Sequence, residues 1–590
     1  MIPNLSEATI RHHTIAQSFE RGQAYYRSGS VYALVQRGDA LSARVEGSEA
    51  EPYRINICFD QGGVTHAVCT CPYNYEGWCK HIVATLLTCL HQPDLVEQRP
   101  ALAAMLAPLN REQLQTIVQN LANEEPDWID AIENQITLLT LSTPVTSQKV
   151  ARRTAVDPKP LERQVERILE RYSEQWNDEP ALDEIRRNLM QKADGFLEQG
   201  DSGNALIILR AIVRAYVKDW MNLDGSSGES GAFFEALDAA LTEAILSAEW
   251  SDRDYQQWQR DLQQWQKEVD DYGVDGFAMS LTALEQGWEY PPLQRVLQGE
   301  ITERGAWEDD APDFADDLAR IRLKILERQG RHQEFLYFAQ AEGQTDRYLQ
   351  TLAKLGRTQE AIAEAQQQMS TAEQALTLAQ TLRAQGELEQ ALSIATQGLA
   401  LQGKSKYQLA VWTSELAEGM GRQETALQAR VTAFKTAPSL SDYLKARELA
   451  GAQWQSLRQA LLTNLRDLSD TLHADATIAI LLHEGLIDAA IAIVDQLSSY
   501  QSVIIHPVMD AAVAHRPEWV IENARRRAES IMNEGKAQYY YYAVNWLRKV
   551  QAAYLQLGQQ QEWQRYRTEL IRTHTRKRKL VSMLQQRDLL

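Results

Sequence analysis

The sequence is poor in cysteine and lacks any long apolar run. Its 590 residues contain five cysteines, and no stretch reaches the roughly 20 apolar residues of a membrane-spanning helix. The start, "MIPNLSEATIRHH", lacks the basic segment and apolar run of a secretory signal peptide. Five cysteines are also too few for a disulfide framework in so long a chain. We therefore expect a cytoplasmic protein in a reducing compartment, without membrane association.

Familiar catalytic motifs are missing as well. The sequence shows no HExxH, no Ser/His/Asp order, no paired-carboxylate motif and no phosphate-binding loop. Its one Gly/Ser tract, "DGSSGESG" (224–231), is not followed by Lys-Ser or Lys-Thr, so we interpret it as a connection between helices. We expect a protein that is not an enzyme, and keep catalysis as the minority alternative.

Positive charge is scarce over most of the chain. The net charge is -20, but residues 501–590 carry 15 Lys and Arg against 8 Asp and Glu, whereas residues 1–95 carry 7 against 9. The remaining centre therefore holds a net charge of -25. Because an acidic surface repels phosphate, a nucleic-acid partner should meet the ends of the chain.

Residues 1–95 have the pattern of a small α+β domain. Ser6 can cap a helix that runs to Arg27, and a second, apolar helix is expected in "HIVATLLTCL". Short β-like runs lie between them, with glycine-containing turns at hairpin spacing. The runs are "VYALVQR", "ALSARVEG", "PYRINICFD" and "VTHAVCTC".

The rest of the chain is predicted to be helical. A helical extension is expected over 96–142, where Asn110 and Gln113 form a capping box, followed by a linker over 143–160. Amphipathic helices then fill 161–590. Glycines at short turns recur every 26 to 35 residues, which is typical of a tetratricopeptide-like (TPR-like) α-solenoid. These glycines are Gly330, Gly356, Gly386, Gly421, Gly451 and Gly485.

Three of the five cysteines fall within "CTCPYNYEGWCKH", residues 69–81. Cys69 and Cys71 end a strand-like run, where alternate residues face one side. Cys79 and His81 open a helix, whose free N–H groups and positive dipole favour a thiolate. Three thiolates and one imidazole form a complete tetrahedral set for Zn²⁺. We predict one zinc ion per chain, and because no position is left open for a substrate, the ion is structural.

The alternatives to this zinc site are weaker. Chance clustering is improbable in so cysteine-poor a chain, and redox chemistry requires a Cys-x-x-Cys pair that is absent. Cys58 is interpreted as a packing residue or a free thiol, Cys89 as a packing residue rather than a fifth ligand, and His66 as a weak substitute ligand. Lys80, between two ligands, is expected to point to solvent, where it can meet a phosphate or a carboxylate.

The motif and its context resemble the SWIM zinc finger. The resemblance covers about residues 10–92 and includes Cys-Pro after the second ligand, Gly-Trp before the third and an apolar helix after the histidine. More loosely, the chain is similar to long prokaryotic SWIM proteins whose helical C-terminal region ends in a Tyr-rich basic stretch, here "KAQYYYYAVNWLRKVQAAYLQLGQQQEWQRYRTEL". The resemblance implies zinc binding by Cys69, Cys71, Cys79 and His81. It also implies DNA binding or protein–protein interaction, often alongside Swi2/Snf2-type ATPases, transposases or recombination factors.

Basic residues near the C-terminus are the candidates for nucleic-acid contact. They are Arg572, Arg576, Lys577, Arg578 and Lys579, with Lys80 as a further candidate and a second cluster at Arg525, Arg526 and Arg527. The alternative is a solvated helix end with no ligand. Two function hypotheses follow: a zinc-stabilised interaction module for nucleic acid or protein on a helical scaffold, and a pure scaffold in which zinc is only structural.

Overall fold

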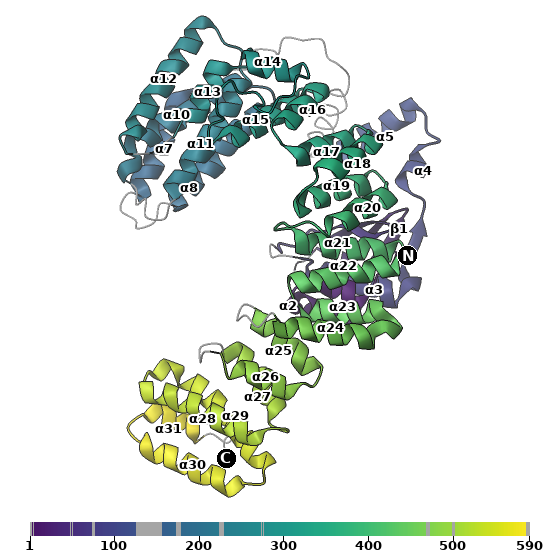
Figure 1. Cartoon of the computed structure of the whole chain (residues 1–590), viewed down its shortest axis with the longest axis vertical. Coiled ribbons are helices and arrows are strands. Elements are labelled where there is room, and N and C mark those ends of the chain that lie inside the picture. Colours follow the sequence, from purple (N-terminus) through teal and green to yellow (C-terminus); the bar gives the residue numbers. More distant parts are fainter. Residues whose placement is uncertain are drawn as a thin grey trace. The chain divides into compact units, whose positions relative to one another are not determined.

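The computed structural model is mostly helical, with one small sheet near the N-terminus (Figure 1). It describes residues 3, 5–47, 49, 51–73, 77–124, 156–172, 179–222, 229–272, 274, 276–467, 473–497 and 502–585. Two compact units are distinguished. Unit 1 comprises Met1–Pro108, Ser370–Ala379 and Leu388–Leu590, and unit 2 comprises Leu109–Met369 and Gln380–Glu387.

The sheet domain opens unit 1. Its strand order is β4-β3-β2-β1-β5, in which β1 to β4 form an antiparallel meander and β5 pairs parallel with β1. The four predicted strands are confirmed, whereas β5 was not predicted because its sequence, Glu-Gln-Arg, carries no apolar pattern. The elements are α1 (Glu7–His12), α2 (Ala16–Arg27), β1 (Val31–Arg37), β2 (Ala40–Val45), β3 (Tyr53–Asp60), β4 (Gly63–Cys69), α3 (Lys80–His91), η1 (Pro93–Leu95), β5 (Glu97–Arg99) and α4 (Leu102–Leu106).

One face of this sheet is covered by α3. Buried and exposed residues alternate along β2 and β3, so every second side chain points into the core. Helix α3 contacts β1 to β4 and packs against α2, and nine of its twelve residues are buried. This apolar helix therefore holds the sheet and α2 together, and its first turn lies next to the end of β4.

The predicted helix from Ser6 to Arg27 is two helices. Ser6 does cap the first, since its hydroxyl accepts a hydrogen bond from Thr9 N at 3.1 Å. The helix then stops at His12, because the His13 carbonyl accepts a hydrogen bond from Trp78 N at 2.7 Å instead of from the next turn. The break thus ties the N-terminus to the segment that precedes Cys79.

Helical hairpins form the remainder of unit 1. Unit 1 shares α19 (Ala372–Ala384) with unit 2. The helices that follow are α20 (Leu388–Gly398), α21 (Lys406–Gly419), α22 (Gln423–Thr436), α23 (Leu440–Ala450), η5 (Gly451–Gln453), α24 (Trp454–Asp467), α25 (Ala474–His483), α26 (Ile487–Val494), α27 (Ser502–Ala512), α28 (Pro517–Glu534), η7 (Ala537–Tyr539), α29 (Tyr540–Gln556), α30 (Gln560–Thr573) and α31 (Arg578–Leu584).

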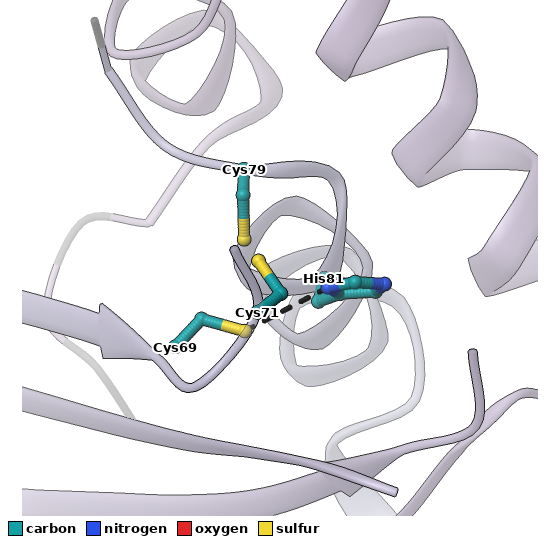
Figure 2. A group of neighbouring side chains, drawn as sticks. All are labelled: Cys69, Cys71, Cys79 and His81. Atoms are coloured by element: carbon teal, nitrogen blue, oxygen red, sulfur yellow. Dashed lines mark hydrogen bonds between the residues drawn. The ribbon is translucent and has the colours of Figure 1, made fainter. Parts of the chain in front are cut away.

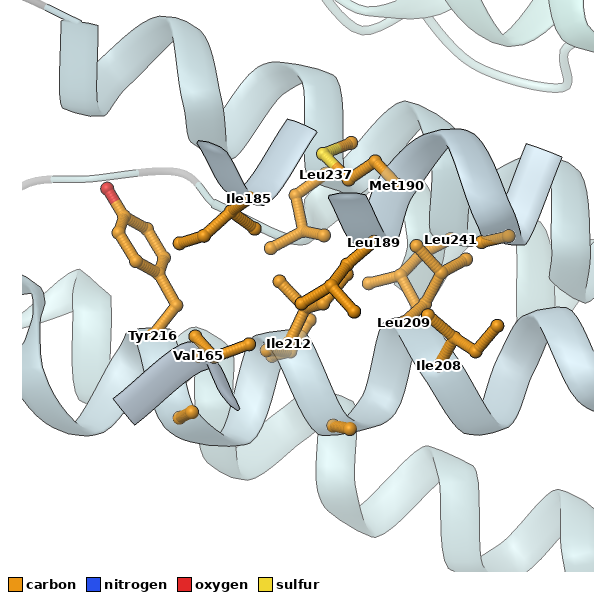
Figure 3. Packing of buried hydrophobic residues seen from close by; sticks show 14 of the residues in the cluster. Val165, Ile185, Leu189, Met190, Ile208, Leu209, Ile212, Tyr216, Leu237 and Leu241 are labelled. Carbon is orange, nitrogen blue, oxygen red and sulfur yellow. The ribbon is translucent and has the colours of Figure 1, made fainter. Parts of the chain in front are cut away.

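The secondary-structure elements in the described residues of unit 2 are all helices. Its elements are α5 (Arg111–Glu124), α7 (Pro158–Tyr172), α8 (Glu179–Ile185), η2 (Arg186–Met190), α9 (Gln191–Glu198), α10 (Ser202–Asp219), η3 (Trp220–Asn222), α11 (Glu229–Leu246), α12 (Asp252–Asp270), α13 (Ala278–Gln286), α14 (Pro291–Leu297), α15 (Ala315–Arg328), α16 (His332–Ala341), α17 (Thr345–Lys354) and α18 (Thr358–Gln368). Side chains from α7, α8, η2, α10 and α11 interlock in its largest core, where Val165, Leu189 and Ile212 meet (Figure 3).

The predicted turn glycines are confirmed. All six have positive φ, between 48° and 84°, and each directly follows a helix or the residue that ends one. Such a backbone conformation is strained for residues with a Cβ atom, which explains why glycine stands there. The capping box is also present, with reciprocal bonds of 2.9 Å between Asn110 and Gln113. Of the predicted linker, residues 143–155 lie outside the described residues, as do residues 223–228 around the Gly/Ser tract.

Candidate metal centre

Two secondary-structure ends bring the predicted ligands together. Strand β4 ends at Cys69, and α3 begins directly after Cys79, which occupies the N-cap position with extended backbone angles. Cys71 lies two residues beyond the strand rather than on it, so the strand prediction was two residues too long. His81 lies in the first turn of α3 and is buried. Residues 74–76 of the intervening loop are outside the described residues.

The four side chains converge on one point. The Sγ atoms of the three cysteines and a ring nitrogen of His81 all lie within 4.8 Å of one another (Figure 2). Cys69 Sγ is 3.7 Å from His81 Nδ1. A tetrahedral zinc ion with Zn–S bonds of about 2.3 Å separates its ligand atoms by about 3.5–4 Å. The Cys₃His cluster therefore fits a zinc site in both donor chemistry and spacing.

Local electrostatics favour a thiolate at the start of α3. The pKa of Cys79 is lowered to about 4, because its sulfur accepts hydrogen bonds from the Cys69 thiol, from His81 and from the N–H groups of His81 and Ile82. The pKa of Cys69 is raised, chiefly because its proton is shared with Cys79, and burial raises the pKa of Cys71. Among these three closely spaced sulfurs, ionisation of one thiol is therefore favoured, and ionisation of the other two is opposed. A dication removes that resistance, which is why clustered thiols bind zinc.

The His81 ring is held by aromatic neighbours. Tyr53 stacks on it with ring centroids 4.3 Å apart, and Tyr25 meets it edge-on at 5.3 Å. The Nδ1 edge faces the sulfurs, while Nε2 is buried and has no hydrogen-bond partner among the described residues. A neutral imidazole that coordinates through Nδ1 carries its proton on Nε2. The two tyrosines were not predicted as part of the site, because Tyr53 lies 16 residues and Tyr25 lies 44 residues before Cys69.

Lys80 differs from its predicted orientation. It is half-buried, and its ammonium group donates a hydrogen bond to the Tyr25 hydroxyl at 3.0 Å while lying 4.6 Å from that ring. Cys89 is buried, which raises its thiol pKa to about 12 and leaves it a packing residue. Cys58 is half-buried on β3, and His66 is exposed on β4; neither belongs to the cluster.

The zinc-site domain packs against the helices of its own unit. His13 Nε2 lies 3.1 and 3.2 Å from the two carboxylate oxygens of Glu415 on α21, and its ring stacks on Trp78 at 4.5 Å. The pKa of Glu415 is held at about 2 against the effect of burial, because His13 and Arg430 lie beside it. The β3–β4 turn also meets the end of α21: a Cβ atom on Gly419 would lie 2.4 Å from Gly62 Cα.

Below this contact lies a buried ion pair. Arg430 on α22 binds Asp442 on α23 at 2.8 Å, and both side chains are almost fully buried. Tyr407 and Ser439 donate further hydrogen bonds to Asp442. Sequence reasoning missed this network, because its members are separated by up to 35 residues and none is unusual by type. It fixes the three helices that carry the docked zinc-site domain.

The basic residues near the C-terminus have different environments. Arg572, Arg576, Arg578 and Lys579 are exposed on and after α30. Lys577 is half-buried and donates to the carbonyl of Met532 at the end of α28. The arginine triplet on α28 does not form a surface cluster. Arg525 lies over the Tyr566 ring, Arg526 is exposed and bonds to Asn523, and Arg527 is buried beside Trp546.

Comparison with known proteins supports the zinc-finger interpretation. No family model matches the chain. A stretch of 115 residues, 19% of the chain, is 34% identical to the zinc finger SWIM domain-containing protein 8 homolog of Drosophila melanogaster. The chain spans about 5% of that protein's length. The matched stretch is therefore similar to a SWIM zinc finger protein, and the Cys₃His cluster fits a zinc site. Among the described residues, no helix is both apolar enough and long enough to span a bilayer.

Proposed function

We propose that this protein is a zinc-binding SWIM-type interaction protein, in which one structural zinc ion is held by Cys69, Cys71, Cys79 and His81. The observation that carries the proposal is the convergence of all four donor atoms within 4.8 Å. Four protein ligands complete a tetrahedron and leave no position for a substrate, so the zinc stabilises the domain and no residue is assigned a catalytic role. A nuclease and phosphatase screen with added metals checks this last point.

The proposed partner surface is an α-helical, TPR-like scaffold in the cytoplasm that ends in exposed cations. Arg572, Arg576, Arg578 and Lys579 are exposed within a C-terminal stretch of positive net charge. Phosphate contacts of this kind are independent of base sequence. The resemblance to SWIM proteins also favours a protein partner, such as a Swi2/Snf2-type ATPase or a recombination factor.

The test is a titration of labelled single- and double-stranded DNA at two salt concentrations. We expect weak, salt-sensitive binding that is lost for the double strand and weakened for the single strand when Arg572, Arg576, Arg578 and Lys579 are all changed to Gln. The affinity falls as salt rises, and each lost phosphate contact makes the slope of log K against log salt shallower by about 0.7–0.9. Lys577 is left unchanged because its ammonium group is engaged with Met532.

A matched control removes the same charge elsewhere. Arg163, Arg167, Arg260 and Lys267 are exposed on unit 2, and their replacement by Gln should leave DNA affinity unchanged. If both quadruple variants bind like the wild type, the C-terminal cations are only surface charge.

The scaffold hypothesis is favoured by a separate observation. The zinc-site domain packs on α21 through His13 and the β3–β4 turn. It therefore has a structural role within its own unit, in addition to any partner that it binds. Affinity purification from the native host, with and without nuclease treatment, separates the two hypotheses. A protein partner that survives nuclease supports the scaffold, and partners lost with nuclease support nucleic-acid binding.

A further inference from the structure

The four consecutive tyrosines at the start of α29 point in different directions. Tyr540 is buried and its hydroxyl donates to the carbonyl of Gly535 at 3.1 Å. Tyr539, Tyr541 and Tyr542 are 42%, 56% and 51% exposed. Their rings remain close to one another, with centroids 6.4 Å apart for Tyr539 and Tyr542 and 6.0 Å apart for Tyr541 and Tyr542. The structure thus places three neighbouring aromatic rings in solvent.

A groove lies between α27 and α29, about one helical turn along α29 from these rings. His506 stacks on Trp546 with centroids 3.8 Å apart, and one turn later Asp510 pairs with Lys549. The groove has a volume of about 460 Å³ and is lined by His506, Asp510, Asn545, Arg548, Lys549 and Ala552.

The groove and the exposed rings belong to one helix face. Tyr541 is followed by Asn545, Arg548 and Lys549 at intervals of four, seven and eight residues, which share a side of an α-helix. Aromatic rings therefore lie at one end of this face, and cationic groups at the other.

The groove carries an excess of positive charge that suits a phosphate, and one carboxylate competes with the phosphate for the cations. Two cations, Arg548 and Lys549, face one carboxylate, Asp510. Arg548 also donates to Asn545 Oδ1 at 2.9 Å, which holds its guanidinium along the helix. Lys536 adds a cation 6.0 Å from the Tyr539 ring. This face lies in the stretch 501–590, whose excess of Lys and Arg over Asp and Glu contrasts with the acidic centre of the chain.

We propose that the α27–α29 face binds single-stranded nucleic acid, with bases stacked on Tyr541 and Tyr542 and the backbone phosphate held by Arg548 and Lys549. Every base has an aromatic face, so stacking on exposed rings combined with nearby cations gives binding that tolerates any sequence. A duplex offers phosphates but keeps its bases paired, so it lacks the stacking contribution. The proposal rests on the proposed nucleic-acid binding and assigns it a second, strand-selective surface distinct from the cations around α30.

The test uses the full-length protein and a fluorescein-labelled oligothymidylate of about 15 nucleotides, with a duplex of equal length as the second probe. The double variant Tyr541→Ala/Tyr542→Ala should weaken single-strand binding at least about tenfold and leave duplex binding unchanged. Tyr541→Phe/Tyr542→Phe keeps the rings and should bind like the wild type. Tyr272→Ala removes an exposed tyrosine of unit 2 and should have no effect.

Two substitutions in the groove test the phosphate contact in opposite directions, because one removes a cation and the other removes a carboxylate. Lys549→Gln should weaken single-strand binding severalfold and lower its salt slope. Asp510→Asn removes the competing carboxylate and should strengthen binding severalfold. All of these positions are at least partly exposed, and circular dichroism should show unchanged helix content in each variant.

The outcomes separate this proposal from the function proposed above. If the alanine and phenylalanine double variants bind the single strand equally well, or if Asp510→Asn weakens binding, the groove proposal is wrong. If those variants match the wild type while the quadruple Gln variant of the α30 cations loses binding, nucleic-acid binding stands without this groove. If the wild type binds neither probe at low salt, both proposals fail.

Discussion

The sheet domain and the helical hairpins of unit 1 are stabilised in different ways. The sheet domain has one small core, in which α3 packs on four strands, and its Cys₃His cluster stands at the edge of that core. Each hairpin from α20 onwards instead packs on the hairpins before and after it. A small domain buries too little apolar surface to be robust alone and benefits from a metal, whereas an array distributes its stability over many similar interfaces.

The contact between the sheet domain and the helical hairpins uses neither a metal site nor a repeated helix interface. It combines an ion pair, His13 with Glu415, and a backbone-to-backbone approach of Gly62 to Gly419. Helix α1 also packs against α23 there, and we expect the contact to separate without unfolding either side. The difference predicts that damage to the metal site stays local, that damage to the buried ion pair spreads through the helices, and that damage to the contact only separates the regions.

Loss of a zinc ligand should have the largest effect. Cys79→Ser replaces a thiolate with a neutral hydroxyl, and structural zinc sites contribute on the order of 10 kcal/mol to the folding of small domains. We expect the variant to lose its zinc and the sheet domain to loosen, while the helices remain folded. Metal analysis with hydrogen exchange measures both effects. Cys58→Ser, outside the cluster, should keep its zinc, and a Cys79→Ser protein with full zinc content would overturn the ligand assignment.

Breaking the buried ion pair should come next. Arg430→Ala leaves Asp442 charged and buried without its partner, which typically costs about 3–5 kcal/mol. Hydrogen exchange should rise across α21, α22 and α23 together. Arg422→Ala is the control: its pair with Glu389 is exposed, and loss of such a pair costs less than about 1 kcal/mol. Equal effects of the two substitutions would contradict the buried network.

A single methyl group should separate the two regions. Gly419→Ala places a Cβ atom 2.4 Å from Gly62 Cα, and overpacking of this kind costs about 1–3 kcal/mol. Helix α21 itself tolerates alanine, so circular dichroism should stay unchanged while protection of the β3–β4 turn falls. If exchange at this turn is the same in the variant, the two regions do not dock through Gly419.

The smallest expected effect is a gain in stability. Gly195 lies inside α9, and a methyl group added there would have no atom of the described residues within 4 Å, so Gly195→Ala should stabilise unit 2 by about 0.5–1 kcal/mol. Gly200, in the next turn, has φ +73°, and Gly200→Ala should destabilise by a similar amount. Thermal unfolding that ranks the two variants in the opposite order would contradict the assigned helix end.

Short-range patterns in the sequence predicted the parts of this structure that depend on neighbouring residues. The four residues of the Cys₃His cluster lie within 13 residues, where the end of a strand and the start of a helix fix the directions of the side chains. The turn glycines are equally local, since each is required by its own φ.

Contacts between residues far apart in the chain could not be predicted from the sequence. The contact between His13 and Glu415 spans 402 residues and uses common residue types. The cluster expected at Arg525, Arg526 and Arg527 fails for a local reason instead: consecutive helical residues differ by about 100° in direction, so three arginines in a row cannot share one face. Lys80 was expected in solvent because Tyr25, its partner, lies 55 residues away.

The approach of Gly62 to Gly419 also limits how freely the sheet domain can be exchanged between proteins. A grafted zinc-finger domain would dock on these helices only if its own hairpin turn lacked a side chain at the matching position, and the recipient helix must end without one as well. The two regions are therefore not interchangeable modules: a chimera that keeps all four zinc ligands but carries a bulky residue at either glycine should fold as two independent bodies.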